Sequence, residues 1–138
     1  MVGRRFYLAA VLLFTASILS ACGLGDRDIV ITDAKTVTDV DEKLAPVRTL
    51  DSFPAGTTKV SCWIKWKDAK INTELLTKWH YVTDDIHITD HAFVVPKKDG
   101  MGSVELAMPE NRSLPPGSYK VDITLGNRIL KTLSFKVE

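Results

Sequence analysis

Three histidines and several aspartates stand close together in the middle of the chain. The histidines are His80, His87 and His91, and the aspartates are Asp84, Asp85 and Asp90. On a helix, His87 and His91 would share one face and could bind a metal ion together. On a strand they would lie about 13 Å apart, too far to share an ion unless a turn at residues 89–90 brought them together. We expect solvated histidines here, with metal binding as the alternative.

The sequence contains no recognisable motif for nucleophilic catalysis. It contains no Gly-x-Ser-x-Gly turn and no glycine-rich phosphate loop. Cys62 could act as a nucleophile, but the alternation of its neighbours places it on the inward face of a strand, where a thiol is inert. Asp84-Asp85 fits a solvated turn. We therefore expect a protein that is not an enzyme, with no catalytic residue and no metal.

The other cysteine, Cys22, ends an apolar N-terminal segment. Arg4 and Arg5 supply positive charge at its start, and residues 6–19 are apolar over a length shorter than the roughly 20 residues of a comfortable transmembrane helix. The segment ends with a hydrophobic residue, two small residues and a cysteine, namely Leu19, Ser20, Ala21 and Cys22.

This ending resembles the lipobox of bacterial lipoproteins. The resemblance implies a signal peptidase that recognises Leu19, Ser20 and Ala21 and cuts before Cys22, which then carries diacylglycerol and an N-acyl chain. It predicts a signal peptide that forms a helix and is removed (1–21), a lipidated linker (22–28) and a folded domain (29–138). Three acyl chains make such a tether effectively permanent. An uncleaved N-terminal anchor is the alternative.

The residues after the cysteine carry a prediction about location. In lipoproteins of bacteria with two membranes, an aspartate directly after the cysteine retains the protein at the inner membrane. Gly23 and Leu24 follow Cys22 here, so the resemblance implies an outer-membrane anchor with the domain in the periplasm. The inner membrane and the cell surface remain open. Because Cys22 is committed to lipid, Cys62 has no intramolecular disulfide partner, and we expect no cofactor besides the covalent lipid.

Charge and composition narrow the choice of partners. The 138 residues are 45% hydrophobic and 25% charged, as in a globular protein of one domain. Loss of Arg4 and Arg5 with the signal peptide would leave 16 basic against 17 acidic side chains. A nearly neutral domain lacks the clustered basic footprint of a nucleic-acid-binding protein, so we expect no nucleic-acid partner.

Beyond the linker, the pattern predicts about seven β-strands. The clearest is at residues 59–67, where apolar side chains alternate with polar ones. Residues 71–82 favour a strand through their β-branched and aromatic content, with a helix as the alternative. Further strands are expected at 28–37, 86–95, 103–108, 119–125 and 128–137, and Gly126-Asn127 should form the last hairpin turn.

Trp63 interrupts the polar outer face of the strand at residues 59–67. Its neighbours on that face are Ser61 and Lys65. Because aromatic residues are enriched at interaction hot spots, we predict Trp63, with Lys65, as a candidate partner contact. In the alternative, a loop or an edge segment covers the indole.

Four segments of the domain resemble immunoglobulin-like or fibronectin-III-like modules of bacterial exported proteins. These are residues 53–56, 79–81, 114–121 and 135–137, which include a Pro-x-Gly-x-Tyr-x-Val segment ending at Val121 and a Phe-x-Val pair ending at Val137. The resemblance implies an antiparallel β-sandwich. The disulfide of true immunoglobulin domains is absent, since the domain contains only Cys62. This fold carries many unrelated functions.

The combined expectation is a non-enzymatic, membrane-anchored lipoprotein that binds an envelope protein, of unknown identity, or supports an assembly. One alternative is a periplasmic inhibitor of a protease or another hydrolase, which would present the loops at residues 97–102 and 109–116. Another is an accessory lipoprotein of a secretion system.

Overall fold

The structure is a computed structural model, and it describes residues 29–138. The predicted recognition residues Leu19, Ser20 and Ala21 lie outside the described residues, as do the rest of the signal peptide and the linker that begins with the predicted lipid site Cys22. In the part of the chain that is described, no helix has the length and apolar character needed to cross a bilayer.

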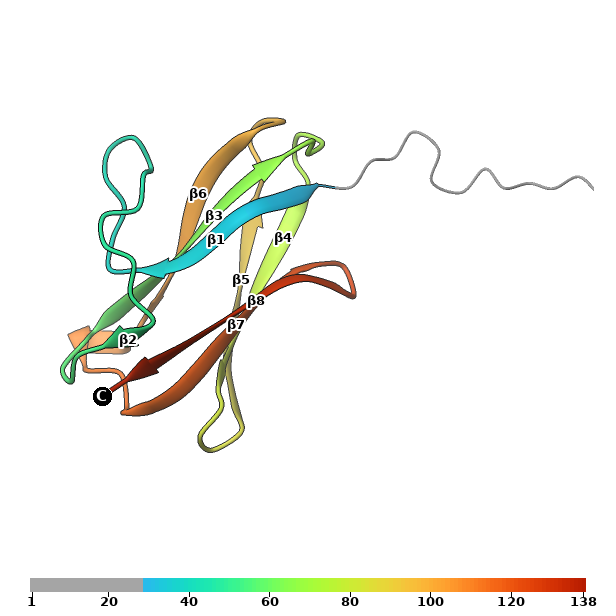
Figure 1. The fold of residues 1–138 in the computed structure, drawn as a ribbon. Coiled ribbons are helices and arrows are strands. Elements are labelled where there is room, and N and C mark those ends of the chain that lie inside the picture. The colour runs from blue at the N-terminus through green and yellow to red at the C-terminus, as the bar shows by residue number, and fades with distance from the viewer. Residues whose placement is uncertain (1–28) are drawn as a thin grey trace, which may run out of the picture.

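Two β-sheets pack face to face (Figure 1). One sheet contains, in spatial order, β1 (Val30–Val37), β3 (Lys59–Lys67) and β6 (Gly100–Ala107). The other contains β2 (Ser52–Phe53), β8 (Arg128–Val137), β7 (Gly117–Leu125), β4 (Glu74–Tyr81) and β5 (Ile86–Val94). A short 3₁₀ turn, η1 (Pro109–Asn111), lies between β6 and β7.

This strand order is that of an immunoglobulin-like sandwich, which confirms the predicted fold class. Strands A, B and E of such domains correspond to β1, β3 and β6, and strands G, F, C and C′ correspond to β8, β7, β4 and β5. Neighbouring long strands are antiparallel. The exception is the two-residue strand β2, which pairs in parallel with the end of β8.

The predicted strands agree with the observed ones in most places. The strand expected at 59–67 is β3 residue for residue, and the ambiguous segment at 71–82 forms the strand β4 and not a helix. Gly126 and Asn127 connect β7 to β8, with Gly126 at a φ of 60°. The eighth strand, β2, was not predicted, because two residues are too few to show an alternating pattern.

The core is built around a cluster of aromatic rings. Phe135 of β8 stacks on Tyr119 of β7, with 5.0 Å between ring centres. It also packs edge to face with Trp79 and Phe53, with 6.2 Å and 5.7 Å between ring centres. Such stacked and edge-to-face pairs add to the stabilisation that comes from burying the rings. The cluster joins β2, β4, β7 and β8 of one sheet through their inward faces.

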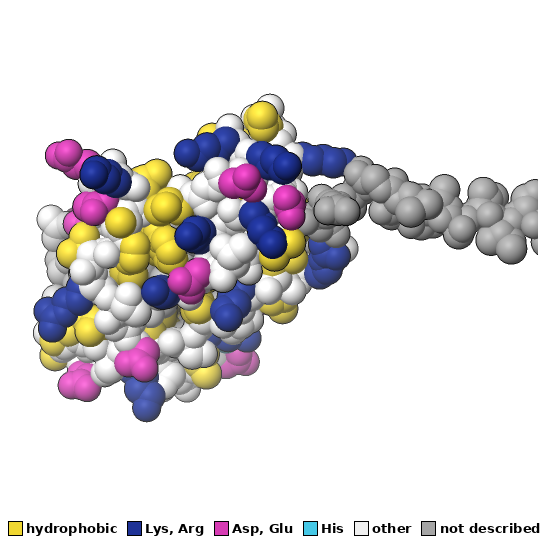
Figure 2. Space-filling model, turned by 45° about the horizontal axis from the view of Figure 1, so that its top comes forward, with side chains coloured by type: hydrophobic (Ala, Val, Ile, Leu, Met, Phe, Trp, Pro, Cys, Tyr) yellow, Lys and Arg dark blue, Asp and Glu magenta, His cyan; other side chains and the backbone are white. Residues whose placement is uncertain are grey.

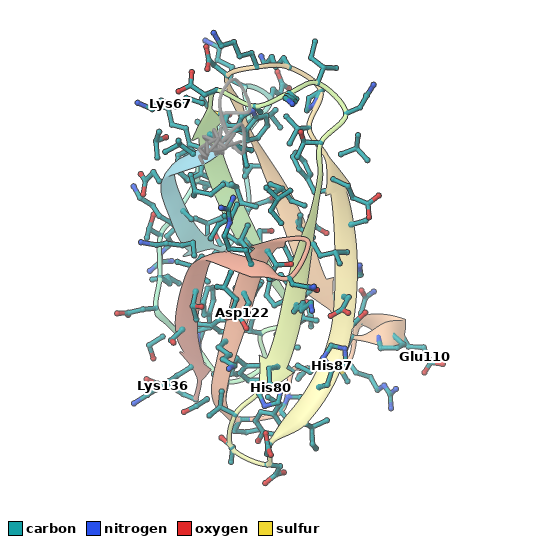
Figure 3. All side chains as sticks on the ribbon, turned by 90° about the vertical axis from the view of Figure 1, so that its right-hand side faces the viewer. Lys67, His80, His87, Glu110, Asp122 and Lys136 are labelled. Carbon is teal, nitrogen blue, oxygen red and sulfur yellow. The ribbon has the colours of Figure 1, made fainter. Side chains whose placement is uncertain are left out.

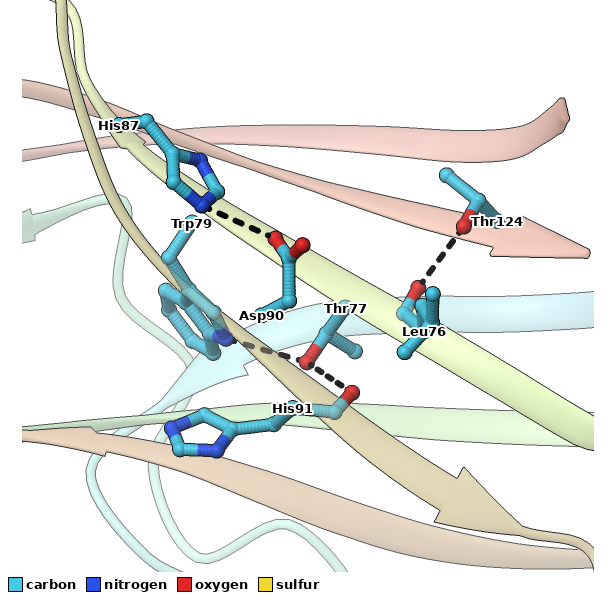
Figure 4. A network of polar contacts seen from close by, with 7 residues as sticks. All are labelled: Leu76, Thr77, Trp79, His87, Asp90, His91 and Thr124. Atoms are coloured by element: carbon cyan, nitrogen blue, oxygen red, sulfur yellow. Dashed lines mark hydrogen bonds and ion pairs between the residues drawn. The ribbon is translucent and has the colours of Figure 1, made fainter. Parts of the chain in front are cut away.

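A polar contact inside the core fixes the position of β4. The indole nitrogen of Trp79 donates to Thr77 Oγ1 at 3.1 Å, and the Thr77 hydroxyl donates to the carbonyl oxygen of His91 at 3.2 Å (Figure 4). On the other side of β4, Thr124 Oγ1 donates to the carbonyl oxygen of Leu76 at 3.3 Å. Buried polar groups are costly when unpaired, so these bonds favour one register of β5, β4 and β7.

Tyr119 ties the connection between β6 and β7 to the sandwich. Its hydroxyl donates to the carbonyl oxygen of Pro115 at 2.5 Å, the arrangement called a tyrosine corner in immunoglobulin-like domains. Burial, with a smaller contribution from Tyr81, raises the pKa of Tyr119 to about 12, so the hydroxyl keeps its proton and remains a donor. Nearby, the Leu114 amide donates to the carbonyl oxygen of Thr57 at 2.8 Å.

We expect Tyr119→Phe to lower the free energy of unfolding by about 1 kcal/mol, since the ring packing is kept while the Pro115 carbonyl loses its donor. Urea unfolding monitored by tryptophan fluorescence measures this change. The control is Ser134→Ala, which removes an exposed hydroxyl from β8 and should change the free energy by less than about 0.5 kcal/mol. Equal stabilities for Tyr119→Phe and the unchanged protein would contradict the role given to the corner.

Candidate functional site

The loop of residues 38–50 covers Trp63 on the outer face of β3. The side chain of Trp63 is only 5% exposed, and its indole nitrogen donates to the carbonyl oxygen of Leu44 at 2.7 Å. The ammonium of Lys35 lies 5.7 Å from the centre of its ring. The prediction of Trp63 as a direct partner contact is therefore corrected, because an indole on a polar face is buried here by its own chain. Lys65 is exposed, and its contact with a partner stays a prediction.

The loop that covers Trp63 has a defined shape of its own. Asp41 Oδ1 accepts the backbone amides of Lys43 at 2.8 Å and Ala45 at 2.9 Å, and Leu44 takes a φ of 61°. A further bridge pairs Val40 with Pro46. The side chains of Leu44 and Val47 are exposed on the outside of this loop. Trp63 thus acts as a platform that holds the loop.

Cys62 lies in the core, as the alternation of β3 predicts. It is fully buried, and burial raises the pKa of its thiol from 9.0 to about 12. A thiol in that state is a poor nucleophile. In antibody domains one cysteine lies on strand B and the other lies on strand F, two residues after the corner tyrosine. Val121 occupies that second position here, so Cys62 packs as an apolar side chain.

The structure brings two of the three histidines side by side, since His80 of β4 and His87 of β5 are register partners. Each pairs with a different carboxylate: His80 Nε2 lies 2.9 Å from Asp85 Oδ1, and His87 Nε2 lies 3.3 Å from Asp90 Oδ1. The side chains of His87 and Asp90 are both well exposed. Among residues 29–138, no three histidine, cysteine or acidic side chains are grouped as a metal site would require.

A largely apolar groove lies where the hairpin between β4 and β5 meets the connection between β6 and β7. Its volume is about 490 Å³. Its lining residues are Tyr81, Asp84, Ile86, His87, Ile88, Met108, Leu114, Pro115 and Tyr119. Tyr81 and Tyr119 stack against each other, with 4.9 Å between their ring centres. We define this feature as the distal groove, because it lies at the end of the sandwich away from residue 29 (Figure 1).

The distal groove includes an exposed apolar side chain. Ile86, at the start of β5, is 50% exposed. Ile86 and Ile88 belong to β5, the last strand of its sheet, whose outer edge pairs with no other described strand. A second hollow, of about 590 Å³, shares Tyr119 with the distal groove. Val82 and Phe135 line it together with charged and serine side chains.

The distal groove was not predicted from the sequence. It brings together three segments that are far apart in the chain, and each segment alone has an ordinary explanation as a strand end or a proline-rich connection. The two loops that are candidates for an inhibitor's contact with a hydrolase lie at opposite ends of the sandwich (Figure 1). Residues 97–99 precede β6 and residues 109–116 follow it, so a single active-site cleft could not accept both.

Comparisons with known proteins support the fold. No protein-family model matches the sequence, and no curated protein matches it. Among solved structures, the crystal structure of an immunoglobulin-like protein from Pseudomonas aeruginosa superposes with a TM-score of 0.58 at 13% sequence identity, covering 83% of this chain and 99% of that one. The domain is an immunoglobulin-like β-sandwich. At this identity the likeness shows the fold alone.

A second solved structure is only partly similar. It is the alkylpurine DNA glycosylase of Pseudomonas fluorescens bound to DNA containing an abasic site analog, with a TM-score of 0.46 and 11% identity. The match covers 86% of this chain and 33% of that one. A likeness of this size carries no argument about function.

We expect Trp63→Ala to lower the free energy of unfolding by about 3 kcal/mol, because it leaves a cavity beneath the loop of residues 38–50. Trp63→Phe should lower it by about 1 kcal/mol, mainly by removing the hydrogen bond to Leu44. Urea unfolding measures both changes, and limited trypsin digestion tests for faster cleavage after Lys43 in Trp63→Ala.

Lys65→Ala is the matched control for the Trp63 variants. Lys65 lies on the same outer face of β3 and is exposed, so its replacement should leave both stability and trypsin resistance unchanged. If Trp63→Ala were as stable and as resistant as this control, the indole would not hold the loop.

Proposed function

We propose that this protein is a non-enzymatic, lipid-anchored binding module of the bacterial cell envelope. Two features support the proposal: the lipobox-like ending at Cys22 and an immunoglobulin-like fold, which is compatible with a binding or assembly role. The proposed anchor is diacylglycerol and an N-acyl chain on Cys22, and the proposed location is the periplasmic face of the outer membrane. The proposal includes no cofactor besides this lipid and no nucleic-acid partner.

The observation that carries the binding role is the distal groove with its exposed rim. Ile86, which lines the groove, is 50% exposed and leaves apolar surface in water beside a concave, largely apolar floor. Exposed apolar surface that is rimmed by polar residues is characteristic of interaction sites. Asp84 and His87 supply such a rim.

The chemistry of the groove favours an extended protein segment as its occupant. The outer edge of β5 can hydrogen-bond to an added strand, and the groove beside Ile86 and Ile88 can accept an apolar side chain from it. An added strand gains affinity from main-chain hydrogen bonds and specificity from the pocket. We propose that the partner is an envelope protein that presents such a segment.

Site-specific photo-cross-linking in intact cells tests the proposal. A photoreactive side chain at position 86 of the full chain should form an adduct with one envelope protein at native expression. The matched control is position 94. Val94 is 52% exposed and lies on the same strand as Ile86, at its other end, so it should give no adduct with that protein.

Substitutions at the same two positions give the quantitative result. Ile86→Asp should weaken binding of the cross-linked partner by about 30-fold, the equivalent of losing one apolar hot spot, while Val94→Asp should leave binding unchanged. Equal losses for the two variants, or adducts at position 94 as strong as those at 86, would show that the groove is not the binding site. An adduct with a hydrolase or with a secretion-system component would decide between the two alternative roles.

A further inference from the structure

The end of the sandwich where the described chain begins is rich in lysine. The loop of residues 68–73 joins β3 to β4 at this end, and residues 95–99 join β5 to β6 beside it (Figure 1). Dark blue lysine and arginine side chains gather around the point where the grey chain meets the domain (Figure 2). We define the tether face by six exposed residues at this end, namely Lys65, Lys67, Lys70, Ile71, Lys97 and Lys98.

The tether face carries more lysines than there are acidic side chains around it. Its five lysines stand against Asp68 and Asp99 in the same loops, Glu74 at the start of β4 and Asp33, the register partner of Lys65. Lys67, Lys97 and Lys98 form no ion pair with any residue in the described range 29–138.

The opposite end of the domain has a different charge pattern. Asp84, Asp85, Glu110 and Glu138 stand there near Arg112 and Lys136. Figure 3 shows Lys67 at one end of the molecule, and Glu110 and Lys136 toward the other. The domain is nearly neutral as a whole, but its basic and acidic side chains are distributed unevenly between its two ends.

Hydrogen bonds join the two loops of the tether face into one surface. The Ala69 amide donates to the carbonyl oxygen of Lys98 at 2.9 Å, and the Asp68 amide donates to Asp99 Oδ1 at 3.0 Å. Beneath them, the indole nitrogen of Trp66 donates to the carbonyl oxygen of Lys97 at 3.0 Å. The backbone that carries Lys97 and Lys98 is thus held in place, and little ordering is needed for these lysines to act together.

Ile71 gives the tether face an apolar tip. It is 64% exposed, more than any other large hydrophobic residue of the described chain. It follows Lys70 in the loop of residues 68–73, which is hydrogen-bonded to the loop that carries Lys97 and Lys98. An exposed apolar side chain near several lysines is typical of surfaces that sit in the headgroup region of a membrane.

The tether face must lie close to the membrane if Cys22 carries lipid. The chain from residue 22 to residue 29 spans at most about 25 Å when fully extended. Val30, next along the chain, is the register partner of Lys67. A surface held this near the bilayer meets the lipid headgroups at a high effective concentration. Contacts that are individually weak are then sufficient to keep the surface bound to the headgroups.

We propose that the tether face docks on anionic phospholipid headgroups, with its lysines against the phosphates and Ile71 at the level of the headgroups. The proposal rests on the lipid anchor of the proposed function. Docking fixes the orientation of the domain, and the distal groove then faces away from the membrane. A lysine near an anionic surface strengthens binding by about five-fold, so a few lysines are enough to orient a domain that is already tethered.

Fluorescence quenching on vesicles tests the docking. The lipid-modified full chain, purified from envelopes, is reconstituted in vesicles of phosphatidylcholine alone or mixed with phosphatidylglycerol, with a quencher attached to some headgroups. A fluorophore is placed through Pro96→Cys beside the tether face, or through Glu110→Cys at the far end. Both positions are exposed, whereas Cys62 is buried and should not be labelled in the folded protein.

The proposal predicts stronger quenching at position 96 than at 110, only on vesicles that contain phosphatidylglycerol. High salt should abolish the difference, because salt screens exposed charges. The variant Lys67→Glu/Lys97→Glu/Lys98→Glu should abolish it as well. The matched variant Arg112→Glu/Lys136→Glu changes charge at the far end and should retain the difference.

Equal quenching at positions 96 and 110, or equal quenching on neutral and anionic vesicles, would overturn the docking. Flotation in high salt distinguishes this result from failure of the anchor. A protein that floats with vesicles but shows no orientation keeps the proposed anchor and loses the docked face. A protein that does not float in high salt lacks the anchor, and both proposals then fail.

Discussion

The packing of Phe135 against Tyr119, Trp79 and Phe53 is the interaction on which the other features of the domain depend. It holds β8, β7, β4 and β2 in one sheet whose inward face meets β3. With strand positions fixed in this way, the connections between strands must emerge at the two ends of the sandwich. The distal groove and the tether face are both made of such connections, so each depends on the same core.

The two ends of the domain carry different kinds of side chain, so they are suited to different contacts. The end near residue 29 carries lysines and Ile71, and the opposite end carries an apolar groove with a polar rim. Binding at the far end and lipid at the near end are compatible, because neither surface competes with the other. The immunoglobulin-like fold alone requires neither use, and the two proposals rest on the side chains that this chain places at its ends.

Sequence patterns predicted most of the architecture because most strands have one buried and one exposed face. Alternation placed Cys62 in the core and gave β3 its bounds, while the Tyr119 segment pointed to an immunoglobulin-like fold. The covering of Trp63 remained open, since its cover comes from Leu44, distant in the chain. The distal groove could not be predicted, because Ile88, Met108 and Leu114 meet only after the sheets have packed. Lys97 and Lys98 likewise become neighbours of Lys67 only in the folded domain.

The proposed orientation of the domain and the outward direction of the distal groove both follow from the proposed lipid anchor on Cys22. Mass spectrometry of the N-terminal peptide of the protein, isolated from its native envelope, tests the anchor most directly. We expect a mature chain that begins at Cys22, with the added mass of diacylglycerol and one N-acyl chain. A chain that still carries residues 1–21, or one that begins elsewhere with no lipid on Cys22, would rule out the lipid anchor.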